Sequence, residues 1–400
     1  MHRVRRFELN TWIDTHENHE TLDMSTTVSS PPLSIDGLVE LSTDPEATRA
    51  ALSLASVPLT YGEPNGSNNL RDSIASLYTN PQVTREHIIT TSGAVAANHI
   101  IFSGLICPGD HIICVYPVYE QLYKISQALG AEVTFWKLDK DNGWTANLQH
   151  LRQEIRENTK MIVLCNPNNP TGTCLSSTVQ NSVLELARAH DITLMVDEVF
   201  RPMFHALPNG DKEPVSFLES GYEKCIVTSS CSKSYGVPGI RVGWIATLSN
   251  DFLSRFTQIR NYTTISVGQI DESIAAEALS SRCRQRLIQR SLDMAKVNLT
   301  FLAKFVAEHP QVTWTPTYAS TSTLIRLHYK DGHPLDDHKF AQRFLEANNI
   351  LFCPASLCFE EYDQGSLQGY LRLGFVMHPE SFRYGMEKLA DFLEAGSDLP

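Results

Sequence analysis

The sequence predicts an α/β fold with a mostly parallel sheet, accompanied by a smaller α+β domain. Between about residues 87 and 246, short apolar runs alternate with helical stretches. After about residue 290 this alternation gives way to an irregular order of helices and strands. The length of 400 residues also exceeds what one hydrophobic core usually organises. These observations together predict two domains.

The strands of the larger domain are predicted from runs rich in β-branched residues, at 87–91, 112–115, 161–164, 192–196 and 226–228. Helical composition and length indicate helices between them, at 94–106, 121–129 and 178–189. In the smaller domain the pattern predicts a strand at 321–327, a helix at 335–347, a strand at 370–375 and a closing helix. We therefore expect a large domain of residues 46–290 and a small domain of residues 1–45 and 291–400.

Composition excludes several classes of partner. The formal net charge of -12 opposes capture by nucleic acid or by anionic lipid, since both bind basic surfaces. The nine cysteines are odd in number and form no C-x-x-C pair, which disfavours a disulfide framework and a zinc site. Apolar runs are too short to span a bilayer. We expect a cytoplasmic protein with a small-molecule partner and no metal.

Polar residues directly after the predicted strands are the first candidates for a site, because open α/β sheets bind ligands beyond the carboxyl ends of their strands. Ser92, Gly93 and Ala94 follow one strand and open a helix, where backbone N–H groups could bind a phosphate or where Ser92 could simply cap the helix. Asn169 lies in the run Asn-Pro-Asn-Asn-Pro-Thr-Gly at 166–172, a rigid turn that could hold its amide in place.

The next two strands lead into a carboxylate and a lysine. Asp197 ends one of them, and a buried carboxylate needs a partner such as a protonated ring nitrogen. The last leads into Ser230-Cys231-Ser232-Lys233. Lys233 could be a solvated surface residue, but among apolar and cationic neighbours its pKa would fall and it could form an imine. Arg241, farther along, suits a phosphate dianion.

Together these motifs resemble the fold-type I pyridoxal-phosphate-dependent enzymes, specifically the aminotransferase class I/II family. The S-x-S-K-x(7)-R run from Ser230 to Arg241 resembles the family's cofactor-lysine signature, and N-P-x-N-P-T-G and V-D-E-V are its companions in the same order. The resemblance covers about residues 57–395, including the segment that begins at Tyr61 and the strand around Arg372. It implies an aspartate-aminotransferase-like fold, whose large domain has a seven-stranded type of sheet sandwiched by helices.

The resemblance also implies the cofactor, pyridoxal 5'-phosphate (PLP), and a role for each matching residue. Lys233 would carry PLP as a Schiff base and move the substrate's Cα proton. Asp197 would pair with the ring nitrogen, Asn169 would donate to the phenolic oxygen, and Tyr119 would stack on the ring. The implied contacts to the phosphate are Ser92, Gly93, Ala94, Ser230, Arg241 and, from a neighbouring subunit, Tyr61. A homodimer with shared active sites follows. Arg372, with Asn169 beside it, would bind the substrate's α-carboxylate.

One position departs from the family pattern, which usually reads D-x-x-Y where this chain has Phe200. The next residue, Arg201, could be a substrate contact or a surface charge. We expect a PLP enzyme that acts on an α-amino acid through an external aldimine and a quinonoid intermediate, and aminotransferase is the first choice. The alternatives are PLP-dependent lyases, cyclases and synthases of the same fold, similar to carbon-sulfur lyases, capreomycidine synthase or aminocyclopropane-carboxylate synthase.

Other classes of protein fit less well. Ser230-Cys231-Ser232-Lys233 also satisfies the S-x-x-K motif of penicillin-recognising serine hydrolases, but the K-T-G run that such enzymes need is missing from the chain. A transcription regulator that uses this fold to bind an effector needs a DNA-binding domain, and the acidic-to-neutral segment before Tyr61 cannot supply one. The presence of Lys233, Asp197, Asn169, Arg241 and Arg372 argues against a catalytically dead relative.

Overall fold

The computed structural model describes residues 5–29, 31–205, 207, 212–361 and 364–395. Its larger sheet has the strand order β2-β9-β8-β7-β6-β3-β4-β5. The strands are β2 (Ile88–Thr91), β3 (His111–Tyr116), β4 (Glu132–Asp139), β5 (Thr145–Ala146), β6 (Thr159–Cys165), β7 (Thr193–Asp197), β8 (Cys225–Ser230) and β9 (Gly243–Thr247). From β8 to β4 each neighbouring pair is parallel, while β9 is antiparallel to both of its neighbours. The mostly parallel sheet is confirmed.

The sequence missed three of these strands. β4 was missed because charged residues interrupt its apolar pattern, as befits a strand near the edge of the sheet, where one face meets solvent. β9 begins at Gly243, two residues after the cofactor-lysine motif ends at Arg241, and it was not predicted as a strand. The two-residue β5 pairs with the outer edge of β4 and adds an eighth strand to the expected seven.

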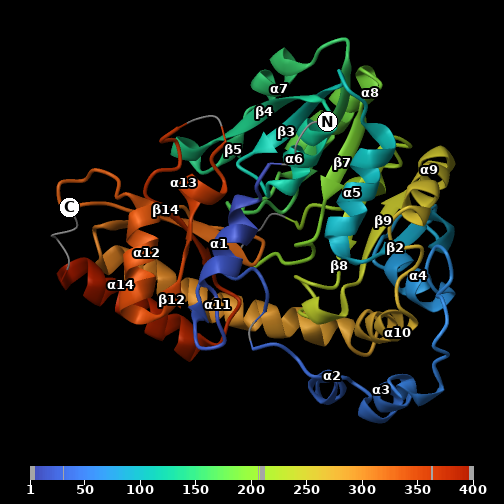
Figure 1. The fold of residues 1–400 in the computed structure, drawn as a ribbon, viewed down its shortest axis with the longest axis horizontal. Helices are drawn as coiled ribbons and strands as arrows, with labels where there is room; N and C mark the ends of the chain where they lie inside the picture. The colour runs from blue at the N-terminus through green and yellow to red at the C-terminus, as the bar shows by residue number, and fades with distance from the viewer. Residues whose placement is uncertain (1–4, 30, 206, 208–211, 362–363, 396–400) are drawn as a thin grey trace.

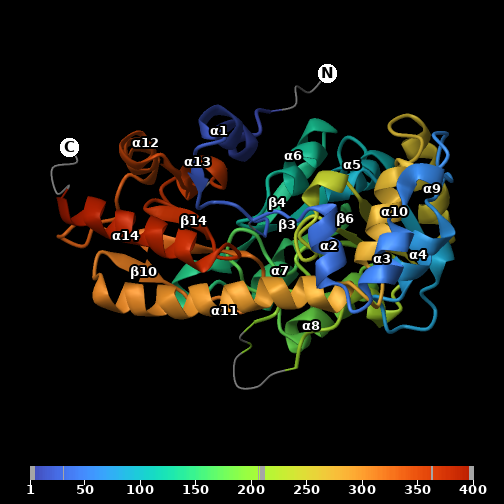
Figure 2. The same ribbon diagram turned by 90° about the horizontal axis from the view of Figure 1, so that it is seen from below.

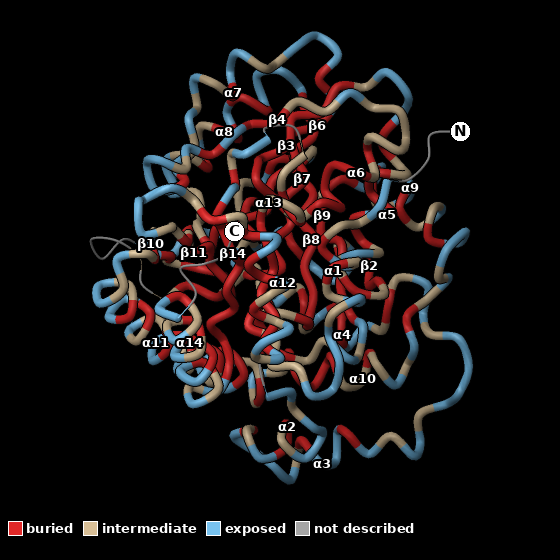
Figure 3. Tube along the Cα trace, turned by 60° about the vertical axis from the view of Figure 1, so that its left-hand side comes forward, coloured by how far each residue is buried: buried red, intermediate tan, exposed pale blue. Residues whose placement is uncertain are grey.

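Helices cover both faces of this sheet. In Figure 2, α5 and α6 lie above the strands, and α8 and the long α11 lie below them. The helices of this part are α4 (Asn68–Ala75), α5 (Gly93–Leu105), α6 (Gln121–Ala128), α7 (Leu148–Glu154), α8 (Ser177–Ala189), α9 (Asn250–Asn261), α10 (Gln269–Ala278) and α11 (Arg284–Glu308). The inner strands β7 and β8 are buried along their whole length, as two-sided coverage requires. Figure 3 shows this buried centre surrounded by exposed loops.

The smaller unit is a four-stranded antiparallel sheet in the order β10-β11-β14-β13. It consists of β10 (Val312–Trp314), β11 (Ser322–Leu327), β13 (Cys353–Pro354) and β14 (Tyr370–Gly374), with α12 (Asp337–Asn348), α13 (Ala355–Cys358) and α14 (Pro379–Ala395). The strands and helices predicted here from the sequence are confirmed to within two residues. Figure 1 shows this unit beside the larger sheet, with α11 running beneath both.

The N-terminal segment joins both parts. Helix α1 (Glu8–His16) contacts α13, and β1 (Leu22–Asp23) pairs with β12 (Ile350–Leu351). Helices α2 (Ile35–Leu41) and α3 (Pro45–Ala51) instead lie near the start of α11, where Thr43 N donates to Arg282 O at 3.1 Å. We retain 46–290 and its flanking segments as the proposed division, with its second boundary inside α11. None of the described helices is long and apolar enough to cross a membrane.

Candidate active site

A cavity of about 210 Å³ lies at the carboxyl ends of β6, β7 and β8, where α1 and β14 close over the sheet. It brings together most of the residues predicted from the sequence: Ala94, Tyr119, Asn169, Asp197, Ser230, Lys233, Arg241 and Arg372. Parallel strands end at the same edge of a sheet, so motifs far apart in the sequence meet there. Arg372 reaches the same cavity from the smaller sheet.

Asp197, the last residue of β7, is a buried carboxylate without a full cationic partner. Its Oδ1 accepts a hydrogen bond from Val199 N at 3.0 Å, and its Oδ2 accepts one from Asn98 Nδ2 at 3.2 Å. Burial nevertheless raises the pKa of Asp197 to about 6, because those two bonds and the nearby Lys233 offset only part of the desolvation. A cationic ring nitrogen would complete this site and return the carboxyl to its ionised form.

Lys233 follows β8 and points its amine into the same cavity. Its Nζ donates to Thr27 Oγ1 at 2.7 Å. Burial lowers the pKa of Lys233 to about 8, and the positive charges of Arg372 and Arg241 lower it further than Asp23 and Asp197 raise it. A sizeable fraction of the lysine is therefore a neutral amine near physiological pH, the form that attacks a carbonyl.

This pKa gives a pH prediction. The rate at which cofactor-free enzyme takes up PLP should rise with pH and level off above about 8, where Lys233 has become neutral. A lysine with an ordinary pKa would keep gaining reactivity to about 10.4. Stopped-flow absorbance of reconstitution across this range measures the profile. A rate that continues to climb through pH 10 would show that the imine-forming amine is not the buried Lys233.

Arg372 and Asn169 form a second polar group in the cavity. Arg372 Nε donates to Ser25 O at 3.0 Å, and its Nη1 donates to Asn169 Oδ1 at 3.4 Å. The guanidinium also lies over the ring of Phe359, 5.5 Å from its centroid. Within the described part of the chain its Nη2 has no hydrogen-bond partner. A buried arginine held in this way presents its remaining N–H groups to a carboxylate.

The third group is a cradle for an anion. Gly93 has φ +78, and a Cβ at this position would stand 2.5 Å from Arg241 Nη2, so only glycine lets the guanidinium approach. Arg241 Nη1 donates to Pro238 O at 2.9 Å and to Ser232 Oγ at 3.3 Å. Ser230 lines the cavity as well. A guanidinium, hydroxyls and the N-terminus of a 13-residue helix meet here, which is the donor set that phosphate requires.

Three of the predicted phosphate contacts, Ser92, Gly93 and Tyr61, do not line the cavity. Ser92 precedes α5 but makes no side-chain capping hydrogen bond, and it does not line the cavity. Gly93 lies under Arg241 instead of on the cavity wall. Tyr61 is 78% exposed and lies in a separate shallow hollow with Ser266 and Val267. Within one chain, Tyr61 therefore lies outside the Lys233 cavity.

Phe200 and Arg201, the unusual pair after Asp197, face different places. Phe200 is buried and lines the Lys233 cavity. Arg201 lies outside it: its Nη1 donates to Pro214 O, and its Nε lies 3.8 Å from Glu198 Oε2. The suggestion that Arg201 contacts a substrate bound at Lys233 thus finds no support in the geometry. Arg201 is not a plain surface charge either, because it forms a partly buried ion pair with Glu198.

Phe200 leads to a spectroscopic prediction. A hydroxyl added there by Phe200→Tyr would enter the cavity and donate to the cofactor's phenolate, and a stabilised phenolate holds the neighbouring imine proton less tightly. The pH midpoint of the Schiff-base absorbance should fall by about one unit, the effect of one charge-assisted hydrogen bond. Phe204→Tyr, buried but outside the cavity, is the matched control. A midpoint that stays or rises would show that another donor already serves the phenolate.

The sequence analysis missed several residues of the site. Thr27 holds the lysine amine, and Asn98 holds Asp197 while accepting from Thr228 Oγ1 at 2.9 Å. Leu9, Asn10 and Ile13 of α1 line the opening. The sequence could have indicated Asn98, since it is a polar residue on the otherwise apolar buried face of α5. Nothing in the sequence indicated Thr27, because it lies 206 residues from Lys233 and outside any motif.

The residues present fit PLP. Lys233 can form the imine, Asp197 lacks the cation that a protonated ring would supply, Arg241 and the start of α5 suit a phosphate, and Tyr119 adds an aromatic wall. A metal site is a poor alternative, since no group of three or more His, Cys, Asp or Glu side chains suited to a metal ion occurs among the described residues.

Comparison with known proteins agrees with this geometry. The family model for aminotransferase class I and II matches residues 36–389. The crystal structure of a PLP-dependent aminotransferase from Streptococcus suis superposes with a TM-score of 0.88 at 34% identity, covering 98% of each chain.

Two more distant relatives add context. Aspartate aminotransferase from Thermotoga maritima has the same fold, with a TM-score of 0.79 at 21% identity over 96% of this chain and 95% of that one. Capreomycidine synthase from Streptomyces vinaceus is 30% identical over 192 residues, so this match spans only about half of either protein (48% of each). The chain belongs to the aminotransferase class I and II family, and it is a PLP-dependent enzyme, an aminotransferase or a related cyclase or synthase.

Proposed function

We propose that this chain is an aminotransferase that moves the amino group of an α-amino acid. The observation that carries the proposal is the joint placement of Lys233, Asp197 and Arg372 in one buried cavity. A proton acceptor, a carboxylate for the ring nitrogen and a carboxylate-binding arginine are the groups that the reaction needs. The similarity to the Streptococcus suis aminotransferase over nearly the whole chain supports the same conclusion.

Each residue has a proposed task. PLP, when bound, supplies a ring that accepts electrons from the substrate's Cα. Arg372 binds the α-carboxylate and so fixes the Cα near Lys233. Lys233, kept partly neutral by its surroundings, takes the proton from Cα and later returns it, while Thr27 orients its amine. Asn98 positions Asp197 for its contact with the ring.

A lyase, cyclase or synthase remains the second candidate, and two observations favour it. Phe200 stands where the family usually has a tyrosine, and part of the chain is similar to capreomycidine synthase. These enzymes share the cofactor site and divert the same chemistry, so cofactor contacts do not separate them.

The cofactor spectrum separates the two candidates. Purified holoenzyme is incubated with single α-amino acids and no keto acid, and its absorbance is followed. An aminotransferase should accumulate the amine form of the cofactor in one half-reaction, and an added keto acid should restore the original spectrum. A lyase or cyclase would return to the original spectrum without a keto acid and release its product. That second result, with a defined amino acid, would overturn the aminotransferase proposal.

We further propose a homodimer in which Tyr61 completes the partner's phosphate site. Tyr61 is 78% exposed, and Leu59 beside it is exposed as well. The segment between α9 and α10 adds two more exposed apolar residues, Tyr262 and Ile265. Gln269 joins these segments, because its Nε2 donates to Thr60 O at 3.0 Å and to Tyr61 O at 3.3 Å. Such a patch indicates an interface. We also propose a cytoplasmic location, supported by nine cysteines that are all free.

Subunit mixing tests the shared site. Lys233→Ala and Tyr61→Ala should each be nearly inactive as homodimers. Refolded mixtures should regain up to about a quarter of wild-type activity, since half of the dimers are mixed and each mixed dimer has one intact site under C2 symmetry. Activity assays on mixtures with differently tagged subunits provide the measurement. If mixed dimers are isolated and remain inactive, Tyr61 does not act across the interface.

A further inference from the structure

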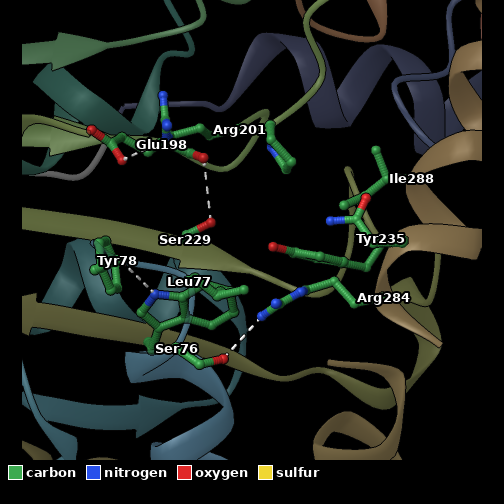
Figure 4. A pocket seen from close by; sticks show the side chains of 12 residues that line it. Ser76, Leu77, Tyr78, Glu198, Arg201, Ser229, Tyr235, Arg284 and Ile288 are labelled. Atoms are coloured by element: carbon green, nitrogen blue, oxygen red, sulfur yellow. Dashed lines mark hydrogen bonds and ion pairs between the residues drawn. The ribbon is translucent and has the colours of Figure 1, made fainter. Parts of the chain in front are cut away.

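A second cavity, of about 200 Å³, is lined by residues that directly neighbour those of the first in sequence (Figure 4). We call it the rear cavity, and its polar lining consists mainly of Tyr78, Glu198, Arg201, Ser229, Tyr235 and Arg284. Successive residues of a strand point to opposite faces of its sheet. Ser230 of β8 therefore lines the Lys233 cavity while Ser229 lines the rear cavity. Glu198 is likewise the neighbour of Asp197, so one stretch of backbone serves both cavities.

Tyr235 is the first sign that the rear cavity binds something. Only 3% of this residue is exposed, and no described residue hydrogen-bonds its hydroxyl. Figure 4 shows the hydroxyl pointing into the middle of the cavity. The hydroxyl of this buried residue opens onto the cavity, so water or a ligand inside the cavity has to supply its hydrogen-bond partner.

The charges around this hydroxyl favour an anion. Arg284 Nη1 donates to Ser76 Oγ at 2.9 Å, which leaves the rest of its guanidinium for another partner. Arg201 lies opposite, beside the carboxylate of Glu198. Glu198 is itself committed, since its Oε1 accepts from Phe217 N at 2.9 Å. Two arginines against one carboxylate leave the lining with a net positive charge.

The start of α11 adds to this preference. Arg284 is the first residue of the 25-residue helix, whose N-cap Cys283 makes no side-chain capping hydrogen bond. The first turn contains no acidic residue. No carboxylate of the first turn therefore neutralises the positive end of the helix dipole, which favours an anion there.

We propose that the rear cavity is a second ligand site, which binds a small anion through a carboxylate or phosphate group. Arg284 and Arg201 bind the oxygens, and the hydroxyl of Tyr235 donates to one of them. The volume of about 200 Å³ is below the 300–1,000 Å³ typical of pockets for drug-sized molecules. It suits inorganic phosphate or a short dicarboxylate. Such a ligand would lie against the segment that carries Lys233.

Calorimetry on the holoenzyme at constant ionic strength tests this proposal, with inorganic phosphate and succinate as probes. Bound cofactor fills the Arg241 cradle, and an Arg372→Gln background removes the other carboxylate site from the succinate titration. We expect saturable binding of at least one probe. Arg284→Gln should weaken it roughly tenfold or more, as loss of a charged hydrogen bond does. Binding of phosphate alone identifies a phosphate site, and binding of succinate alone a carboxylate site.

The matched control is Arg286→Gln, which removes the same charge from an exposed residue of the same helical turn that does not line the cavity. It should leave affinity nearly unchanged. Tyr235→Phe removes one hydroxyl and should weaken binding severalfold, and it serves as the test if Arg284→Gln does not fold. The proposal is overturned if neither probe saturates, or if the Arg284 and Arg286 variants bind equally well. Transamination plays no part in this readout, so its outcome is independent of the proposed reaction.

Discussion

Lys233→Ala should remove the imine between protein and cofactor and reduce turnover by at least roughly 10²–10⁴-fold, the range expected for loss of a general base. Purified wild-type enzyme should be yellow, and borohydride should reduce its Schiff base and fix the cofactor to a peptide that contains Lys233. The variant should show neither property, because no other lysine among the described residues lines the cavity. Absorbance, peptide mapping and steady-state kinetics measure these effects.

Lys224→Ala is the matched control, since Lys224 is a partly exposed lysine that pairs with Asp191 on the surface. It should keep the colour and the activity. If borohydride fixed the cofactor to another lysine, the assignment of the whole cavity would fail.

Arg372→Ala should have the second largest effect, on the binding of α-amino acids. Arg372 is 3% exposed and already held by Ser25 and Asn169. Removing it would leave a substrate carboxylate buried without its partner, at a cost of roughly 2–5 kcal/mol. We expect dissociation constants for amino acids and dicarboxylate inhibitors to rise roughly thirtyfold or more. Amines without a carboxylate should lose much less.

Arg326→Ala is suited as the control, because Arg326 lies on the neighbouring strand β11 and packs over Tyr370, away from the cavity. Its loss should leave substrate affinity nearly unchanged. If the Arg372 and Arg326 variants bound amino acids equally well, another group would have to hold the carboxylate.

The sequence predicted the central strands of the larger sheet because buried parallel strands are continuous apolar runs. β6, β7 and β8 have this character and were located to within a few residues. β4 was not predicted, since charged residues interrupt its apolar pattern. The domain boundary expected at about residue 290 also falls inside the long helix α11, which begins at Arg284. Local patterns therefore identified the centre of the fold better than its edges.

Arg201 shows that the sequence did not predict which way a side chain in the site points. Its position four residues after Asp197 left open whether its side chain would reach a substrate. The tertiary structure turns the chain so that Phe200 faces Lys233 and Arg201 faces Glu198 and the rear cavity. Two neighbouring residues of the turn after β7 thus line different cavities, and residue type alone does not say which cavity each one lines.

The sequence by itself determined the family, the cofactor and the residues of its main motifs, because these lie at strand ends that a parallel sheet brings to one edge. Only the tertiary structure decided which residues surround them. Thr27 reaches Lys233 from the N-terminal segment, and burial, which no motif encodes, moves the pKa of Lys233 down and that of Asp197 up. Such effects depend on solvent exclusion and on charges brought together from distant parts of the chain.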